Sequence, residues 1–161
     1  MRLIAHRALR NGPNRELENH PLEISQCLDQ GFEVEVDVWY QQGQWWLGHD
    51  EPTYPTTIEF LNQAGIWIHV KNFEAADKLV ELTHQGWEFN FFAHDRDERT
   101  LTSHGFWWTQ PGLEFGPRSI VVMPEWHVDV EHIESVWDWN CAGVCSDYVD
   151  RIRAAQRKSG K

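Results

Sequence analysis

The chain has 161 residues, enough for a single domain with its own hydrophobic core. Asp and Glu number 25 against 14 Lys and Arg, and the formal net charge of -11 argues against a nucleic-acid-binding protein, which needs a basic surface. No run of about 18 apolar residues occurs, so no transmembrane helix is expected, and the opening residues MRLIAHRALR lack the apolar stretch of a signal peptide. Three cysteines are too few for a disulfide framework and favour a cytoplasmic location.

Short apolar strands alternate with helical segments along the chain. The predicted strands are Leu3–His6, Glu33–Tyr40, Trp45–Gly48, Ile66–Lys71, Glu88–Ala93, Phe106–Thr109, Ser119–Met123 and Gly143–Ser146. The predicted helices are Pro21–Gln30, Thr56–Ala64, Glu74–His84 and Val130–Trp137. This alternation is typical of parallel βα units in an α/β fold. Two layouts fit it, a closed barrel and an open doubly wound sheet.

The segment Glu33–Val38 alternates strictly between acidic residues and valines. Successive side chains of a strand point to opposite faces, so the valines share one face while Glu33, Glu35 and Asp37 share the other. In a surface strand, the acids would face solvent. In a barrel, the valines would pack against the helices, and the acids would point inward near the carboxyl end of the strand, where catalytic groups collect.

Polar groups also follow other apolar strands in the first half of the chain. The polar endings are His6-Arg7, Glu35-Val36-Asp37, His49-Asp50 and His69-Val70-Lys71. One such ending is common by chance, whereas four in a short stretch indicate a site for metal binding, phosphate binding or proton transfer.

These residues resemble the glycerophosphodiester phosphodiesterase family, within the wider phospholipase C-like phosphodiesterase superfamily. The family pattern is His-Arg, then Glu-Asn, then Gly-x-x-x-Glu-x-Asp-Val, then His-Asp, then Glu-x-Lys. The matching segments are His6-Arg7, Glu18-Asn19, Gly31 through Val38, and His49-Asp50, and Gly143 through Tyr148 is similar to the closing strand of the family. The resemblance implies a single phosphodiesterase-like domain over residues 1–161.

The implied fold is a compact TIM-like (β/α) barrel with about seven parallel strands. Because a full eight-unit barrel usually has about 250 residues, the barrel is expected to be reduced or incompletely closed. Two further departures concern single residues. Ala8 stands where the family has a glycine after His-Arg, and His69 replaces the glutamate of Glu-x-Lys.

By this resemblance, the protein is a metal-dependent phosphodiesterase acting on glycerophosphodiester-like small molecules or lipid head groups. His6 and His49 are the implied general base and general acid, in either order, because the unperturbed histidine pKa suits both tasks. Arg7 and Lys71 are the implied phosphate-binding residues, and Arg can form paired hydrogen bonds with phosphate oxygens. Arg7 and Lys71 could also form salt bridges with the acidic residues of the site while they bind phosphate.

The implied metal ligands are Glu35, Asp37, His69 and, as a further candidate, Glu18. Carboxylates favour Mg²⁺ or Ca²⁺, whereas the nitrogen of His69 shifts the preference toward Mn²⁺ or Zn²⁺. Three alternatives stay open: His69 contacts the substrate or a metal ligand instead of the ion, His49 contacts the metal, and Glu18 holds Asn19 in place.

Several residues have weaker assignments. We expect Glu33 to be a buried ion-pair partner of Lys71 or Arg7. The other candidates for lining the mouth of the site are His94-Asp95, Glu125 and Asp147. Most of the ten tryptophans are expected in the core. The rim tryptophans either cover exposed core or form a substrate platform: Trp39, Trp45, Trp46, Trp107, Trp108 and Trp126.

Two alternative functions remain. The first is a lyase of the same superfamily that stops at a cyclic phosphate, and the second is a barrel that binds a metal or a phosphorylated ligand without turnover. A nuclease is disfavoured by the net charge of -11. Nucleotide-binding folds lack support because neither GxGxxG nor GxxxxGK[ST] occurs.

Overall fold

The computed structural model describes residues 1–159, with side chains through residue 155. The strands are β1 (Arg2–Ala5), β2 (Glu33–Gln41), β3 (Gln44–Leu47), β4 (Tyr54–Thr56), β5 (Ile66–Val70), β6 (Asn90–Ala93), β7 (Arg99–Leu101), β8 (Trp107–Thr109), β9 (Ser119–Val122) and β10 (Gly143–Ser146). The α-helices are α1 (Pro21–Asp29), α2 (Ile58–Leu61), α3 (Phe73–His84) and α4 (Val149–Ser159), and the 3₁₀ helices are η1 (His6–Ala8), η2 (Pro124–Trp126) and η3 (Val130–Asp138).

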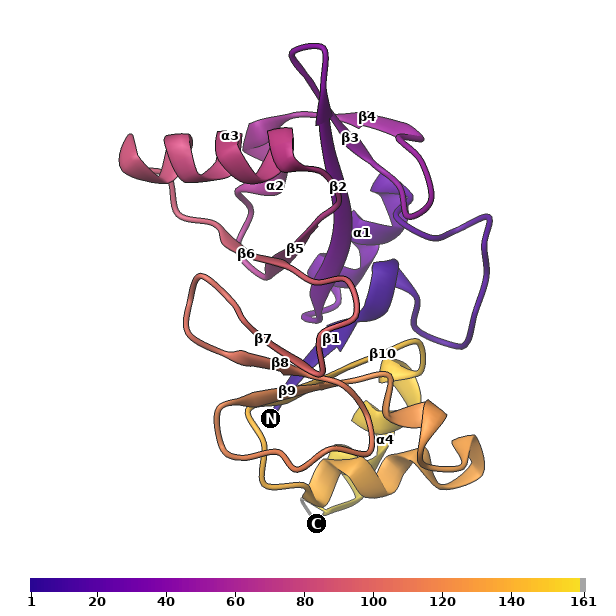
Figure 1. Cartoon of the computed structure of the whole chain (residues 1–161). Helices are drawn as coiled ribbons and strands as arrows, with labels where there is room; N and C mark the ends of the chain where they lie inside the picture. The colour runs from indigo at the N-terminus through magenta and orange to yellow at the C-terminus, as the bar shows by residue number, and fades with distance from the viewer. Residues whose placement is uncertain (160–161) are drawn as a thin grey trace.

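All described strands belong to one curled sheet (Figure 1). Parallel ladders join the strands in the order β6-β5-β2-β1-β10-β9-β8. The hairpin strands β3 and β4 extend from β2 in antiparallel fashion, and β7 is antiparallel to β8. The prediction of a mixed α/β fold is therefore confirmed. The first and last strands, β1 and β10, are neighbours, so the parallel strands follow the chain order around the curve.

Two hydrophobic clusters lie on opposite faces of the sheet. The outer cluster joins the valines of β2 to α1 and α3, as the alternation predicted, and includes Val34, Val36, Ile24 and Leu79. The inner cluster takes side chains from six strands and the turn after β9. Its members are Ile4, Trp67, Phe92, Trp108, Ile120, Val122, Met123 and Cys145. Because one compact cluster receives residues from so many strands, the sheet must curve around it.

The sheet has a seam between β6 and β8, because no ladder joins these two strands within residues 1–159. Side chains cross the seam instead, and the ring centroids of Phe92 and Trp108 are 4.3 Å apart. The segment that contains β7 also binds the free edge of β6. Ser103 Oγ donates to the carbonyl of Phe89 (2.8 Å) and accepts from the amide of Phe91 (2.9 Å), while Thr100 Oγ1 donates to the carbonyl of Ala93 (3.1 Å).

Some elements differ from the prediction. The helix expected over Thr56–Ala64 is the single turn α2, and the one expected over Val130–Trp137 is the 3₁₀ helix η3. The prediction lacked α4, because its mostly polar sequence has only a short apolar stripe, in which Val149 and Ile152 are buried. It also lacked β4 and β7, which have three residues each.

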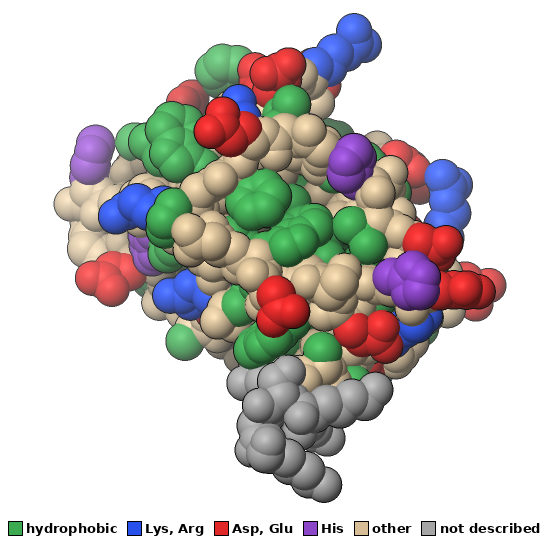
Figure 2. All heavy atoms as spheres, turned by 90° about the horizontal axis from the view of Figure 1, so that it is seen from below, with side chains coloured by type: hydrophobic (Ala, Val, Ile, Leu, Met, Phe, Trp, Pro, Cys, Tyr) green, Lys and Arg blue, Asp and Glu red, His purple; other side chains and the backbone are tan. Residues whose placement is uncertain are grey.

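The helices and one face of the surface can be compared with what membrane-spanning and nucleic-acid-binding proteins need. Among the described helices, none has the length and apolar character needed to cross a bilayer. Seen from below, one face shows hydrophobic side chains near its centre, with acidic, basic and histidine side chains scattered around them (Figure 2). Lys and Arg do not gather into a stripe on that face.

Candidate functional site

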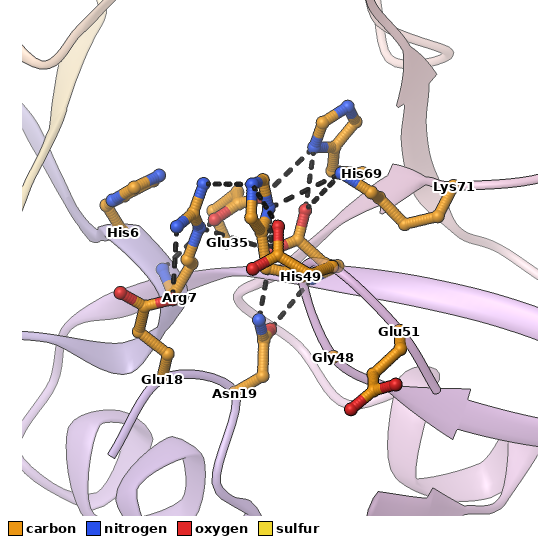
Figure 3. Close-up of polar contacts among 12 residues, drawn as sticks. His6, Arg7, Glu18, Asn19, Glu35, Gly48, His49, Glu51, His69 and Lys71 are labelled. Atoms are coloured by element: carbon orange, nitrogen blue, oxygen red, sulfur yellow. Dashed lines mark hydrogen bonds and ion pairs between the residues drawn. The ribbon is translucent and has the colours of Figure 1, made fainter. Parts of the chain in front are cut away.

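The polar strand endings meet in one cavity of about 670 Å³ (Figure 3). The cavity lies at the carboxyl ends of β1 and β5 and beside Glu35 of β2, the strand that is parallel to both and lies between them. Its walls include His6, Arg7, Glu35, His49, His69 and Lys71. Residues that are 65 positions apart in the sequence therefore face one space, as expected where parallel strands end at one edge of a sheet.

Asp37 is the buried centre of the site and is fully inaccessible to solvent. Asn19 binds it at two points, because Asn19 Nδ2 donates to Asp37 Oδ2 (2.9 Å) and the Asp37 amide donates to Asn19 Oδ1 (2.8 Å). The amide of Asn19 in turn donates to the carbonyl of Arg7 (2.9 Å). Asn19 has a φ of 58°, a conformation that asparagine tolerates better than most residues. This residue ties the loop after β1 to β2.

Besides Asn19, four nitrogen-bearing side chains contact the Asp37 carboxylate. His49 Nδ1 lies 3.1 Å and Arg7 Nε 3.2 Å from Oδ2, while His69 Nδ1 lies 2.9 Å and Lys71 Nζ 3.4 Å from Oδ1. The N–H of Arg7 Nε is not aimed well enough for a hydrogen bond, so its contact with Asp37 is an ion pair only. Burial opposes ionisation of Asp37, but the hydrogen bonds from His49 and His69 and the charge of Lys71 hold its pKa well below the usual range.

Glu35, Asp37 and His69 form the candidate metal cluster, in which one ligand atom from each residue lies within 4.8 Å of the others. Asp37 and His69 are paired in the β2–β5 register. His69 Nδ1 is 2.9 Å from Asp37 Oδ1 and 3.7 Å from Glu35 Oε1. Ligands that each lie about 2.0–2.4 Å from a common ion have separations of this size, so the cluster fits a divalent cation.

The ring of His69 is held from its other side. Its Nε2 lies 3.1 Å from the carbonyl oxygen of His94 and can donate to it, which leaves Nδ1 facing the two carboxylates. The ring also stacks on Phe92 with parallel planes, 5.2 Å between centroids.

Burial and the charge of Asp37 raise the pKa of Glu35, because two neighbouring buried carboxylates disfavour each other's ionised form. A cation placed between them would remove that penalty.

His6 and Arg7 lie in a tight turn at the end of β1. His6 Nδ1 lies 2.8 Å from Asp147 Oδ1, at the end of the neighbouring strand β10. Burial would lower the pKa of His6, but the hydrogen bond with Asp147 and the charge of Glu35 outweigh it and raise that pKa. Arg7 has a left-handed backbone (φ 50°), and its amide donates to Glu35 Oε2 (3.0 Å).

His49 reaches Asp37 because of the turn after β3. Gly48 has a φ of 149°, and a Cβ at this position would lie 2.1 Å from the carbonyl oxygen of Glu51. The amide of Gly48 donates to the carbonyl of Asp37 (3.1 Å), and its carbonyl accepts from Trp39 Nε1 (2.7 Å). The turn therefore requires glycine at position 48, and it places His49 over Asp37.

Two sequence-based assignments need correction. Glu33 pairs with Arg2 and accepts from Trp67 Nε1 (2.6 Å), so it is not a partner of Lys71 or Arg7. Glu33 lies at the amino end of β2, too far along the strand to reach them. Glu18 lies outside the metal cluster, and its Oε2 accepts from Arg7 Nη1 (3.1 Å).

The structure also places the remaining candidates for the cavity wall and the tryptophans. His94, Asp95 and Trp126 line the cavity, and Gln110, which the sequence did not single out, lies there too. Gln110 Nε2 is 2.8 Å from His94 Nε2. Two contacts could not be predicted from the local sequence. These are the hydrogen bond between His6 and Asp147 and the double contact of Asn19 with Asp37. Only the family pattern pointed to the residues involved. Of the rim tryptophans, Trp45 and Trp108 are buried, whereas Trp126 is 70% exposed.

Comparison of this chain with protein-family models, curated proteins and solved structures finds no match. The resemblance drawn from the motifs therefore rests on the residues themselves.

Proposed function

We propose that this protein is a metal-dependent phosphodiesterase that cleaves small phosphodiesters of the glycerophosphodiester or lipid head-group type. The observation that supports this proposal is the meeting of His6, His49, Arg7 and Lys71 in one cavity with Glu35 and His69, two members of a Glu-Asp-His cluster whose third member, Asp37, is buried beside them. Cleavage of a phosphodiester needs neutralisation of its negative charge, a base and an acid. The cavity offers a candidate group for each need.

Arg7 and Lys71 are the candidate phosphate-binding residues. Arg7 Nη2 lies 3.0 Å from His49 Nε2, and Lys71 Nζ lies 3.4 Å from His49 Nδ1. A phosphate group bound by both cations would therefore lie beside the ring of His49. The guanidinium of Arg7 suits two phosphate oxygens, and Lys71 adds a point charge.

His6 is the candidate general base. A proton on Nδ1 shared with Asp147 leaves Nε2 free to accept the proton of the attacking hydroxyl while its oxygen bonds to phosphorus. His49 is the candidate general acid, because its ring adjoins both phosphate-binding cations. Arg7 Nη2 donates to His49 Nε2 in this structure, so Nε2 would carry a proton and donate it to the leaving alcohol oxygen, as its bond to phosphorus breaks, once a phosphate oxygen has taken the Arg7 N–H.

Glu35, Asp37 and His69 would hold the divalent ion. When bound, the ion would supply positive charge to the phosphoryl oxygens in the transition state. Asn19 and the carbonyl of His94 would keep Asp37 and His69 in the orientations described above.

We also propose that the curled sheet is an incomplete TIM-like barrel, in which the segment around β7 replaces a missing parallel βα unit. The adjacency of β1 and β10, the inner cluster and the position of the site at the carboxyl ends of the strands support this interpretation.

The test is a panel of phosphodiesters, including glycerophosphocholine and bis(p-nitrophenyl) phosphate, assayed with Mg²⁺, Ca²⁺, Mn²⁺ and Zn²⁺ and with a chelator. We expect metal-dependent turnover that Glu35→Gln or Asp37→Asn abolishes, because amides are poorer ligands for hard cations. Glu33→Gln is the matched control on the same strand, since Glu33 pairs outside the site. Full turnover by either site variant in metal-free buffer would reject the proposal.

Two further outcomes separate the alternatives. A cyclic phosphate that accumulates in phosphorus NMR spectra would identify a lyase. Metal binding by the Glu-Asp-His cluster without turnover of any substrate would favour the non-catalytic barrel.

A further inference from the structure

Glu125 is a largely buried carboxylate that has no part in the chemistry proposed above. It lies in η2, directly after β9, and forms no ion pair with any described side chain. Burial raises its pKa, so the protein maintains this group at an energetic cost. A buried acid without a cationic partner needs another explanation.

Both oxygens of Glu125 bind the end of β10. Oε1 accepts from the amide of Asp147 (2.8 Å), and Oε2 accepts from Ser146 Oγ (2.9 Å). Ser146 Oγ also accepts from the amide of Tyr148 (3.0 Å). Ser146 is fully buried and Asp147 is 4% exposed, so the turn that Glu125 binds is sealed from solvent.

The backbone before Glu125 is strained. Met123 has a φ of 45°, which is unfavourable for a long side chain, and its amide donates to the carbonyl of Cys145 (2.7 Å). Such strain persists where surrounding contacts enforce it, and it clusters at functional sites. Here the strained turn directs Glu125 at Ser146 and Asp147.

The turn bound by Glu125 carries the partner of His6. In the β1–β10 register, Ala5 is opposite Ser146, so Asp147 lies beside His6. The hydrogen bond from His6 Nδ1 to Asp147 Oδ1 spans 2.8 Å and depends on where the backbone of Asp147 is held. We propose that Glu125 is a positioning residue for His6, acting through the turn Ser146-Asp147. This inference rests on the proposed function, in which His6 transfers a proton.

A role limited to stability is the competing explanation, since Glu125 also joins β9 to β10. The experiment therefore reads the tautomer of His6 by ¹⁵N NMR in metal-free protein, which needs no substrate. The unmodified protein is expected to carry the proton on Nδ1, facing Asp147. Glu125→Ala is expected to produce a mixture of tautomers and to lower kcat about 10- to 100-fold, with KM little changed.

Glu125→Gln is the conservative variant, because its amide oxygen can accept from Asp147 and its NH₂ group can donate to Ser146 Oγ. It is expected to keep the Nδ1 tautomer and most of the activity. Glu134→Ala is the matched control, because the Glu134 carboxylate pairs with Arg151 instead of the Ser146-Asp147 turn. In a His6→Ala background, Glu125→Ala is expected to cause no further loss of kcat.

An unchanged His6 tautomer in Glu125→Ala would overturn the inference, even if the phosphodiesterase activity is found. The reverse result, an altered tautomer in a protein without turnover, would support the positioning role and reject the proposed function. If Glu125→Ala does not fold, Glu125→Asp makes the same comparison, because it withdraws the carboxylate by one methylene group from both donors.

Discussion

The two histidines of the cavity differ in their partners, and both are expected to be essential. His6 shares a proton with Asp147, whereas His49 lies between Arg7 and Lys71. His6→Ala and His49→Ala should each lower kcat by about two or more powers of ten, the usual contribution of general acid–base catalysis. The pH–rate curve should be bell-shaped. Steady-state assays measure kcat and its pH dependence for these variants, with His84→Ala as a control at an exposed histidine. Normal turnover by His6→Ala or His49→Ala would show that this histidine takes no part in the reaction.

We expect His69 to influence which metal ion binds and how that binding depends on pH. A metal-facing nitrogen must lose its proton, and the hydrogen bond with Asp37 together with Glu35, despite burial, raises the pKa of His69. Metal binding should therefore weaken as the pH falls through this raised pKa. His69→Glu should bind Mg²⁺ and Ca²⁺ more tightly, with binding that persists to lower pH. Calorimetric titration at pH 6 and 8 tests this, and identical affinities in both proteins would place His69 outside the ligand set.

The turn after β3 contains Gly48, at a position where a larger residue would clash with the backbone. Gly48→Ala should destabilise the protein and lower kcat, because the new Cβ would lie 2.1 Å from the Glu51 carbonyl and would displace His49. Gly43→Ala, in the turn between β2 and β3, is the matched control, since its φ of 77° is also positive but no atom lies within 4 Å of the new Cβ. The control should lose only about 1 kcal/mol, from backbone strain alone. Chemical denaturation and kcat are measured for both, and equal losses would contradict the steric argument.

The seam between β6 and β8 depends on Ser103, which binds both Phe89 and Phe91 of the β6 edge. Ser103→Ala should lower the free energy of unfolding by about 1–2 kcal/mol, because two hydrogen bonds are lost at a partly exposed edge. The amide of Phe91 should also exchange hydrogen faster. Hydrogen-exchange NMR tests this against Ser25→Ala, which removes only a bond to the carbonyl of Pro21 within a helix. Unchanged exchange at Phe91 would show that the seam is closed by other contacts.

The stability of the whole molecule should depend on pH through His6 and His69. Both have folded-state pKa values raised above 6.5, against the effect of burial, by hydrogen bonds with Asp147 and Asp37. The folded protein thus holds these protons more tightly than the unfolded chain. The resulting stability is fully present below pH 6.5 and is lost as the pH rises through the folded pKa values.

Urea denaturation in a chelating buffer between pH 6 and pH 9 measures this loss. His69→Gln, which cannot titrate, should show a shallower decline. A steeper decline, or a stability that rises over this range in the unmodified protein, would contradict the assignment of raised pKa values to these histidines.

Much of the fold follows from local sequence patterns. The alternation in β2 predicts a strand with valines toward the helices, and the structure buries Val34 and Val36 against α1 and α3. The apolar periodicity of α3 likewise marks its bounds to within one residue. Such patterns report burial directly, because side chains repeat every two residues in a strand and every 3.6 in a helix. Two strands that the sequence analysis lacked, β4 and β7, have three residues each and are too short to show a clear period.

The sequence by itself determined which residues are candidates for the site, because His6 and His69 follow apolar residues and Asp37 lies on the acidic face of an alternating strand. Only the tertiary structure decided their partners. Strand register places His69 beside Asp37, and the neighbouring ends of β1 and β10 bring Asp147 to His6, across 141 positions of the chain. Local propensity carries no information on such contacts, since they depend on how distant strands pair and how the sheet curls.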